Sequence, residues 1–213
     1  MVFIYGSNFY GKVAQVNHQW IETKFATFMF FPIFPIGSIL VTSSSFRERQ
    51  GINISTYKKS VAATYARIFS LLFAIWFIYD LFSSYSFGKL NDLVWALIFS
   101  ALWVYFYFFY GRPTADELTI RNKVGTVTGM YALPNWFDFS YRRNKLRDYE
   151  NLYKTKYPDN DWKTDLRDNH TDPEKLPLLY IIALYNCTVY DIPENDELYN
   201  KADLMYNPVA KQP

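Results

Sequence analysis

Two long apolar runs interrupt an otherwise mixed sequence of 213 residues. Residues 93–111 contain no charged side chain. At about 1.5 Å per helical residue they nearly cross a hydrocarbon core of about 30 Å. A helix buried in a soluble protein shows a polar stripe, and this run shows none. A second apolar run covers residues 61–82, and because only residues 83–92 separate the two, they predict an antiparallel transmembrane hairpin over residues 58–112.

One face of the first run carries small side chains at every fourth position: Ala62, Ala66, Ser70 and Ala74. Such faces let helix backbones approach closely inside a membrane, so the spacing predicts a helix-packing face. Arg67 lies about two turns into the same helix, and long cationic side chains lean back toward the near interface. An anchoring role for Arg67 is therefore favoured, and a functional charge inside the membrane is the alternative.

Residues 1–57 alternate short apolar runs with glycine, serine and asparagine, which is typical of strands and turns. Short strands are predicted at residues 2–5, 13–16, 39–42 and 52–54. The run at 25–34 contains Pro32 and is followed by Pro35. Proline is excluded from a helix interior and confines a strand to a sheet edge. The pattern predicts a small β-rich head on the membrane surface.

The region after the hairpin, residues 113–213, is predicted to be helical with an extended tail. The predicted elements are a helix from Thr114 to about Lys123 that stops near Gly125, a helix over 135–157, a buried or interface helix over 176–190, and a polar irregular stretch over 193–213. At the start of the first helix, the threonine and a glutamate three residues later have the spacing of a capping box. The run at 176–190 is too short to cross a membrane. The expected fold class is an α+β membrane protein.

Lysine and arginine are concentrated on one side of the predicted hairpin. They stand at Arg47, Arg49, Lys58 and Lys59 before it and at Arg112, Arg121 and Lys123 after it, whereas the connection carries Lys89. Loops rich in lysine and arginine stay inside, so both termini are predicted on the cytoplasmic or matrix side. The expected location is a bacterial inner or mitochondrial inner membrane.

Acidic side chains are concentrated in the last quarter of the chain. Residues 158–213 hold 11 of the 20 acidic residues but 5 of the 22 basic ones. A segment with one strongly apolar stretch cannot offset the entropy of ordering by folding on itself. We therefore expect an acidic, partner-binding tail in which residues 176–190 dock against the preceding basic helix or a neighbouring subunit.

The predicted helix over 135–157 carries a basic cluster formed by Arg142, Arg143, Lys145 and Arg147. Anionic lipid attracts each nearby lysine or arginine by about 1 kcal/mol. The cluster is thus predicted to bind lipid headgroups or a protein partner, and pairing with the acidic tail is the alternative. Bound phospholipid is the only ligand expected, and nothing else in the sequence supports nucleic-acid binding.

Side chains that carry catalysis are sparse. The two histidines, His18 and His170, are far apart, and Cys187 is alone, so no internal disulfide or cysteine-based zinc site is expected. The sequence has no P-loop, dinucleotide fingerprint or nucleophile elbow. The acids at 159–165 lack the glycine and terminal glutamate of an EF-hand. No catalytic residue, metal or cofactor is expected, and the chain is not expected to be an enzyme.

The first part of the sequence contains Tyr5-Gly6, Tyr10-Gly11-Lys12-Val13, Thr23-Lys24-Phe25 and the stretch FPIFPIGSILV over residues 31–41. These segments resemble an uncharacterised family of small two-span membrane proteins, over about a quarter of the chain. Related heads with a similar stretch carry paired cysteines and look like zinc ribbons. This chain lacks those cysteines, so the resemblance implies the two-span architecture and no zinc site.

These features together indicate a non-catalytic accessory subunit of a larger membrane complex. The packing face and the aromatic content of 21% both suggest more contact surface than a small monomer buries. The membrane is expected to be an energy-transducing one, as in a respiratory chain. The alternative is a membrane-anchored module that binds lipid or a partner.

Overall fold

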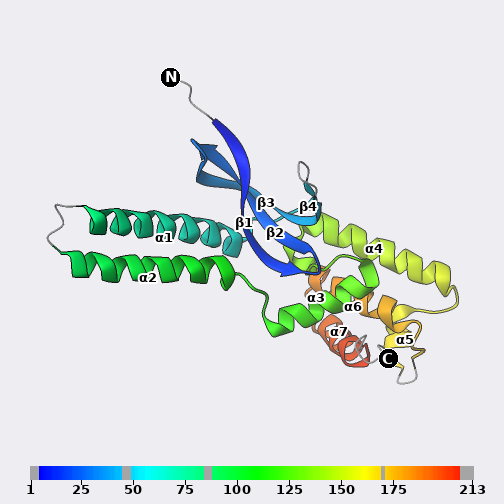
Figure 1. The fold of residues 1–213 in the computed structure, drawn as a ribbon. Coiled ribbons are helices and arrows are strands. Elements are labelled where there is room, and N and C mark those ends of the chain that lie inside the picture. Colours follow the sequence, from blue (N-terminus) through cyan, green and yellow to red (C-terminus); the bar gives the residue numbers. More distant parts are fainter. Residues whose placement is uncertain (1–4, 45–48, 84–87, 169–170, 207–213) are drawn as a thin grey trace. The chain divides into compact units, whose positions relative to one another are not determined.

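The computed structural model describes residues 5–44, 49–83, 88–168 and 171–206. It is an α+β structure that divides into two compact units, Met1–Thr114 and Ala115–Pro213. The first unit holds a β-sheet and two long helices, and the second is helical (Figure 1). The predicted strand at 2–5 lies almost entirely outside the described residues.

The N-terminal sheet is an antiparallel meander with the strand order β1-β2-β3-β4. The strands are β1 (Tyr5–Val16), β2 (Gln19–Phe28), β3 (Phe31–Ser44) and β4 (Arg49–Ile54). Between the predicted strands at 2–5 and 13–16 a break was expected, but β1 runs through Gly11 without interruption. Gly11 and Ala14 adopt positive φ angles of 71° and 52°. The β1–β2 register shifts on both sides of Val13, so these residues form bulges within one long strand.

The two prolines lie where β3 is an edge. Strand β4 pairs with β3 only from Ser38 to Ser44, so Pro32 and Pro35 have a partner strand on one side alone. On that side the β2–β3 register shifts twice, between Lys24 and Phe25 and between Ala26 and Thr27. The expectation that proline confines this stretch to a sheet edge is thus met locally.

Two helices are long and apolar enough to cross a membrane. They are α1 (Lys58–Phe82) and α2 (Lys89–Phe108). The ring of Phe73 stacks on Phe99 at 5.0 Å, and that of Phe77 on Trp95 at 6.2 Å. Residue numbers rise along one helix as they fall along the other, so the helices are antiparallel (Figure 1). Residues 84–87 of the predicted connection lie outside the described residues.

The observed second helix begins and ends earlier than the predicted span of 93–111. It ends at Phe108, and Gly111 then adopts a φ of 82°, which turns the chain out of helical geometry. Along the predicted packing face, Ser70 and Ala74 are buried, Ala66 is half-buried and Ala62 is exposed. Within this chain, the face is therefore packed only in its C-terminal half.

A buried network of hydroxyl groups joins the sheet to the start of α1. Ser60 Oγ donates to the carbonyl oxygen of Gly11 at 2.7 Å and accepts from Thr23 Oγ1 at 2.9 Å. Thr23 and Ser38 share a further hydrogen bond of 2.8 Å, and Ser38 accepts from the Tyr57 amide. Buried polar networks that are satisfied in this way fix one arrangement of the elements they connect.

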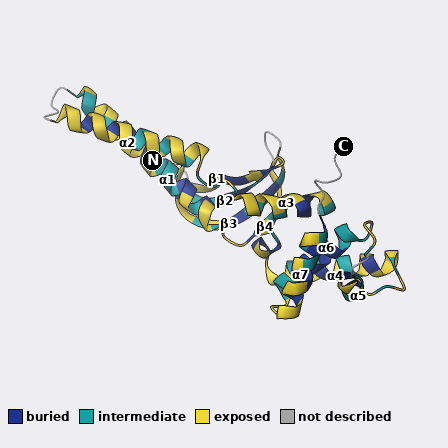
Figure 2. Ribbon diagram, turned by 90° about the horizontal axis from the view of Figure 1, so that it is seen from below, coloured by how far each residue is buried: buried dark blue, intermediate teal, exposed yellow. Residues whose placement is uncertain are grey.

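The C-terminal unit is built around one apolar helix. Its elements are α3 (Ala115–Thr128), the 3-10 turn η1 (Pro134–Trp136), α4 (Phe139–Lys156), α5 (Trp162–Arg167), α6 (Leu176–Val189) and α7 (Pro193–Met205). Every residue of α6 from Leu179 to Asn186 is buried. Helices α3, α4 and α7 all contact α6, which forms the centre of this unit (Figure 2). The prediction of a buried helix here is confirmed.

Two helical boundaries differ from the predicted ones. Helix α3 continues through Gly125 instead of stopping there. This glycine allows the ring of Tyr131 to pack closely against the helix, because an added Cβ would lie 2.4 Å from that ring. The helix ends at Thr128, just before Gly129, whose φ is 73°. The stretch predicted to be irregular forms α7, which starts with Pro193 in the first turn and carries acids there. Residues 207–213 lie outside the described residues.

The acidic region folds onto the rest of its own unit. Helix α6 packs against α4, where Leu146 belongs to the buried core, and Arg142 donates to the backbone carbonyl of Thr188. Of the two docking alternatives for residues 176–190, the structure shows the first. The described part of this region is ordered against the preceding helices rather than on itself alone, because its core includes Val124 of α3 and Leu146 and Tyr153 of α4.

Candidate functional site

The predicted basic cluster on α4 does not converge on one point. Arg142 is bound to Thr188 and lies over the ring of Phe139, and Lys145 pairs with Asp148 at 3.5 Å. Arg143 and Arg147 are exposed. Half of the cluster is therefore engaged within the fold, which leaves two separate surface arginines rather than a shaped site.

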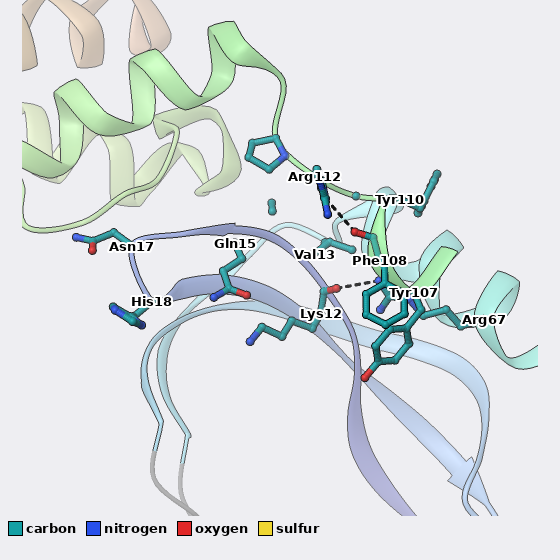
Figure 3. Close-up of a pocket in the computed structure, with 13 residues that line it drawn as sticks. Lys12, Val13, Gln15, Asn17, His18, Arg67, Tyr107, Phe108, Tyr110 and Arg112 are labelled. Atoms are coloured by element: carbon teal, nitrogen blue, oxygen red, sulfur yellow. Dashed lines mark hydrogen bonds between the residues drawn. The ribbon is translucent and has the colours of Figure 1, made fainter. Parts of the chain in front are cut away.

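The structure instead brings together three cations that lie far apart in the sequence. They line an open cavity of about 710 Å³ in the first unit. The lining residues are Lys12, Val13, Ala14, Gln15, Asn17, His18, Arg67, Tyr107, Phe108, Tyr110, Gly111, Arg112 and Pro113 (Figure 3). We call this the basic cavity. Its lining contains no acidic residue.

Arg67 is held by backbone carbonyls on two elements. Its Nε donates to Phe106 at 2.8 Å and its Nη2 to Lys12 at 3.1 Å, and the guanidinium lies 5.6 Å from the Tyr107 ring centroid. Lys12 follows Gly11, which is bound to the first turns of α1. The side chain thus reaches back toward the start of its helix, in the direction expected of an anchoring arginine. A guanidinium has five N–H donors, so this arrangement leaves some for a ligand.

Arg112 and Lys12 complete the positive lining. Arg112 Nε donates to the carbonyl of Phe108 at 2.9 Å, which satisfies one of the carbonyls at the end of α2. The ammonium of Lys12 lies 3.9 Å from the ring centroid of Trp20. Among the ion pairs of the described residues, none involves Lys12, Arg67 or Arg112. Three uncompensated cations in one cavity favour an anion.

A tight turn presents His18 at the rim of the cavity. Val16 pairs with Gln19, so the hairpin loop consists of Asn17 and His18, with φ angles of 43° and 63°. Two consecutive positive φ angles are the geometry of a type I′ turn, in which asparagine is favoured. Asparagine in this turn could be recognised from the sequence, but no sequence pattern indicates that the turn lines the same cavity as Arg67 and Arg112.

The other end of the sheet carries a cluster of exposed apolar side chains. It consists of Met29, Phe30, Phe31, Ile33, Phe34 and Ile36, which are between 49% and 65% exposed. We call residues 29–36 the apolar tip. Its turn residues, Met29 and Phe30, have φ angles of 48° and 71°. Left-handed backbone costs a residue other than glycine about 1–2 kcal/mol, so strain and exposed apolar surface coincide here.

Prolines and tyrosine hydroxyls remove or engage several backbone polar groups of the apolar tip. Pro32 and Pro35 have no N–H, and the hydroxyls of Tyr10 and Tyr65 donate to the carbonyls of Phe30 and Ile33 at 2.7 and 2.8 Å. Between the tip and α1 lies an apolar groove of about 330 Å³, lined by Tyr10, Phe30, Phe31, Ile68, Leu71 and Leu72. The tip thus lies beside the part of α1 that is apolar enough to be in a membrane.

The acidic stretch at 159–165 has a structural role in the second unit. Asp161 caps α5 by accepting from the Thr164 amide at 3.1 Å. Burial opposes ionisation of Asp165, but hydrogen bonds from Lys175, Tyr153 and Asn160 together hold its pKa below the ordinary value. Among the described residues, no group of three or more histidine, cysteine or acidic side chains could hold a metal ion.

Cys187 is expected to react slowly with maleimide while the chain is folded. Burial, and secondly the negative charge of Asp196, raise the pKa of its thiol to about 11. Compared with an ordinary thiol of pKa 9.0, the reactive thiolate is then about 100-fold less populated near neutral pH. Labelling of the full chain before and after unfolding in dodecyl sulfate measures this, since Cys187 is the single cysteine. Equal rates in both states would contradict it.

Comparison of the chain with known protein families, curated proteins and solved structures gave no match. The resemblance to two-span membrane proteins therefore stays a prediction. The basic cavity and the apolar tip are the two features of the first unit that bear on its function.

Proposed function

We propose that the chain is a non-catalytic accessory subunit of a larger membrane assembly, anchored by the α1–α2 hairpin with both termini on the cytoplasmic or matrix side. The observation that carries the proposal is the apolar tip, whose six large side chains stay exposed at a strained turn. Exposed apolar patches mark surfaces that contact a protein or a membrane. The choice of a bacterial or mitochondrial inner membrane stays a prediction.

The chemistry of the tip supports a dry environment. In the hydrocarbon region every backbone polar group needs a partner within the protein. Here two prolines remove donors and two tyrosine hydroxyls occupy acceptors, along the stretch of β3 that β4 does not cover. In water, by contrast, the solvent can satisfy exposed backbone groups without such partners. It supports contact with lipid or with another membrane subunit.

A membrane-anchored lipid-binding module is the second candidate function. The basic cavity favours it, because its cations lie beside the end of a helix that is apolar enough to cross a membrane. The two candidates differ in what covers the apolar tip: a constant protein neighbour for a subunit, and bulk lipid for a free module.

Photo-crosslinking at the tip distinguishes the candidates. We expect benzoylphenylalanine in place of Ile36, introduced into the full chain in its native membrane, to yield one discrete protein adduct. The matched control is Gln50, which is also exposed but lies on β4, beside the opposite end of β3. Lipid adducts alone at Ile36 would favour the lipid-binding module. Adducts with neither lipid nor protein would contradict both candidates.

A further inference from the structure

We propose that the basic cavity binds the headgroup of an anionic phospholipid from the leaflet in which α1 starts and α2 ends. The inference rests on the membrane placement proposed above but not on the existence of a protein partner. It assigns the lipid to Lys12, Arg67 and Arg112 rather than to the basic cluster on α4.

The first argument is the chemistry of the lining. Three cations and a histidine line one cavity of about 710 Å³ that contains no carboxylate. Ligand sites typically measure about 300–1,000 Å³. Arginine forks and a lysine ammonium are the side chains that proteins use for phosphate oxygens. Nε and one Nη of Arg67 and the Nε of Arg112 are used by carbonyls, which fixes both guanidinium planes and leaves other N–H groups for a ligand.

The second argument is the depth of the cavity. Arg67 belongs to α1, and Tyr107 and Phe108 are the last residues of α2, so both apolar helices contribute to the wall. Tyrosine is enriched at the level of lipid headgroups, where its ring is in apolar surroundings and its hydroxyl is wet. The cavity has cations together with the apolar side chains of Val13 and Phe108. A soluble anion would use only the cations, whereas a phospholipid would use both.

The third argument is rigidity. The amide of Ala14 donates to the carbonyl of Gly111 at 2.7 Å, which ties the strand that carries Lys12 to the segment that carries Arg112. Arg67 bridges the same two segments through Lys12 and Phe106. The backbone segments that carry Lys12 and Arg112, and the Arg67 side chain, are therefore held in place before a ligand arrives, which lowers the entropic cost of binding.

The test is a lipid titration of the full chain in neutral detergent, read by native mass spectrometry. The added probes are dioctanoyl phosphatidylglycerol, dioctanoyl phosphatidylcholine and, in a separate arm, inorganic phosphate. We expect phosphatidylglycerol to bind more tightly than phosphatidylcholine. Lys12→Gln and Arg112→Gln should each weaken that binding about fivefold, and the double variant about 30-fold, as removal of about 1 kcal/mol per charge implies.

The matched control is the double variant Arg143→Gln, Arg147→Gln, which removes the same charge from exposed positions on α4. It should change phosphatidylglycerol binding less than about twofold, because its charges lie outside the cavity. An equal loss in the control and cavity variants, or no loss in either, would overturn the assignment. Inorganic phosphate that binds as tightly as the lipid would show a site for a soluble anion and overturn the lipid assignment. A chain that forms no protein crosslink at Ile36 can still bind phosphatidylglycerol in this titration. Failure of the accessory-subunit proposal can therefore be distinguished from failure of the phospholipid assignment.

Discussion

Replacing Gly11 with alanine is expected to loosen the sheet from α1 and lower the free energy of unfolding of the first unit by about 2–5 kcal/mol. A Cβ at this position would lie 2.3 Å from the carbonyl oxygen of Ser60 and 2.4 Å from Thr64 Oγ1. The φ of 71° adds a left-handed cost of about 1–2 kcal/mol, and overpacking adds about 1–3 kcal/mol. The closest atom belongs to the backbone, so a change of side-chain rotamer cannot relieve the contact.

Thermal unfolding of the full chain in detergent, followed by limited proteolysis, measures this effect. Two glycines provide controls. A Cβ added at Gly37 would have nothing within 4 Å, and its φ is not positive, so Gly37→Ala should change stability little. Gly129 also has free space but a φ of 73°, so Gly129→Ala reports the left-handed cost alone. If Gly11→Ala is no worse than Gly129→Ala, the close approach of β1 to α1 is not what requires glycine.

Replacing Arg121 with leucine is expected to destabilise the second unit by about 3–5 kcal/mol, the usual cost of breaking a buried ion pair. The Arg121 side chain is fully buried; it donates to the carbonyl of Tyr131 at 2.8 Å and pairs with Glu117 at 3.3 Å. Its guanidinium also lies 4.8 Å from the ring centroid of Trp136. Removal of Arg121 takes a buried cation away from the carboxylate of Glu117, of which only 11% is exposed, and leaves the space of the guanidinium unfilled.

Unfolding of the full chain by urea, followed by the protection of the second unit from protease, measures the loss. Arg147→Leu is the matched control, because Arg147 is an exposed arginine on α4 of the same unit. It should change stability by less than about 0.5 kcal/mol. Arg121→Leu, Glu117→Leu removes both charges and should recover part of the loss. A single variant as stable as the control would show that Glu117 finds another partner.

The elements that could be predicted from sequence are those in which one strong signal dominates. The hairpin and the buried helix α6 have continuous apolar runs, and the edge position of Pro32 and Pro35 follows from the chemistry of proline alone. In the sequence, Gly11 and Gly125 resemble residues that end a strand or a helix. A glycine that permits a turn cannot be told from one that permits close packing by its sequence alone. Their roles become visible only with the neighbouring element in place.

The candidate sites were harder to predict for a related reason. The basic cluster on α4 is dense in sequence, but helical geometry directs its members to different surroundings. The cations of the basic cavity are instead far apart in the sequence and are brought together by the fold. Lys12 lies on a strand, Arg67 on a helix and Arg112 on the segment after a helix. The position of Arg67 in an apolar run indicates an anchor, yet no spacing rule connects it to the other two cations. Sites assembled from separate elements need the fold first.

The hydroxyl network at Ser60 also has a mechanical consequence. Hydrogen bonds among Thr23, Ser38, Gly11 and Ser60 join the sheet to the first turn of α1. The sheet and α1 are therefore expected to tilt together. At about 1.5 Å per residue, the apolar run at 61–82 of α1 is about 33 Å long, slightly more than a hydrocarbon thickness of about 30 Å. A helix that is too long for its bilayer tilts. If the hairpin spans a membrane as proposed, a change in bilayer thickness would therefore change the depth of the apolar tip.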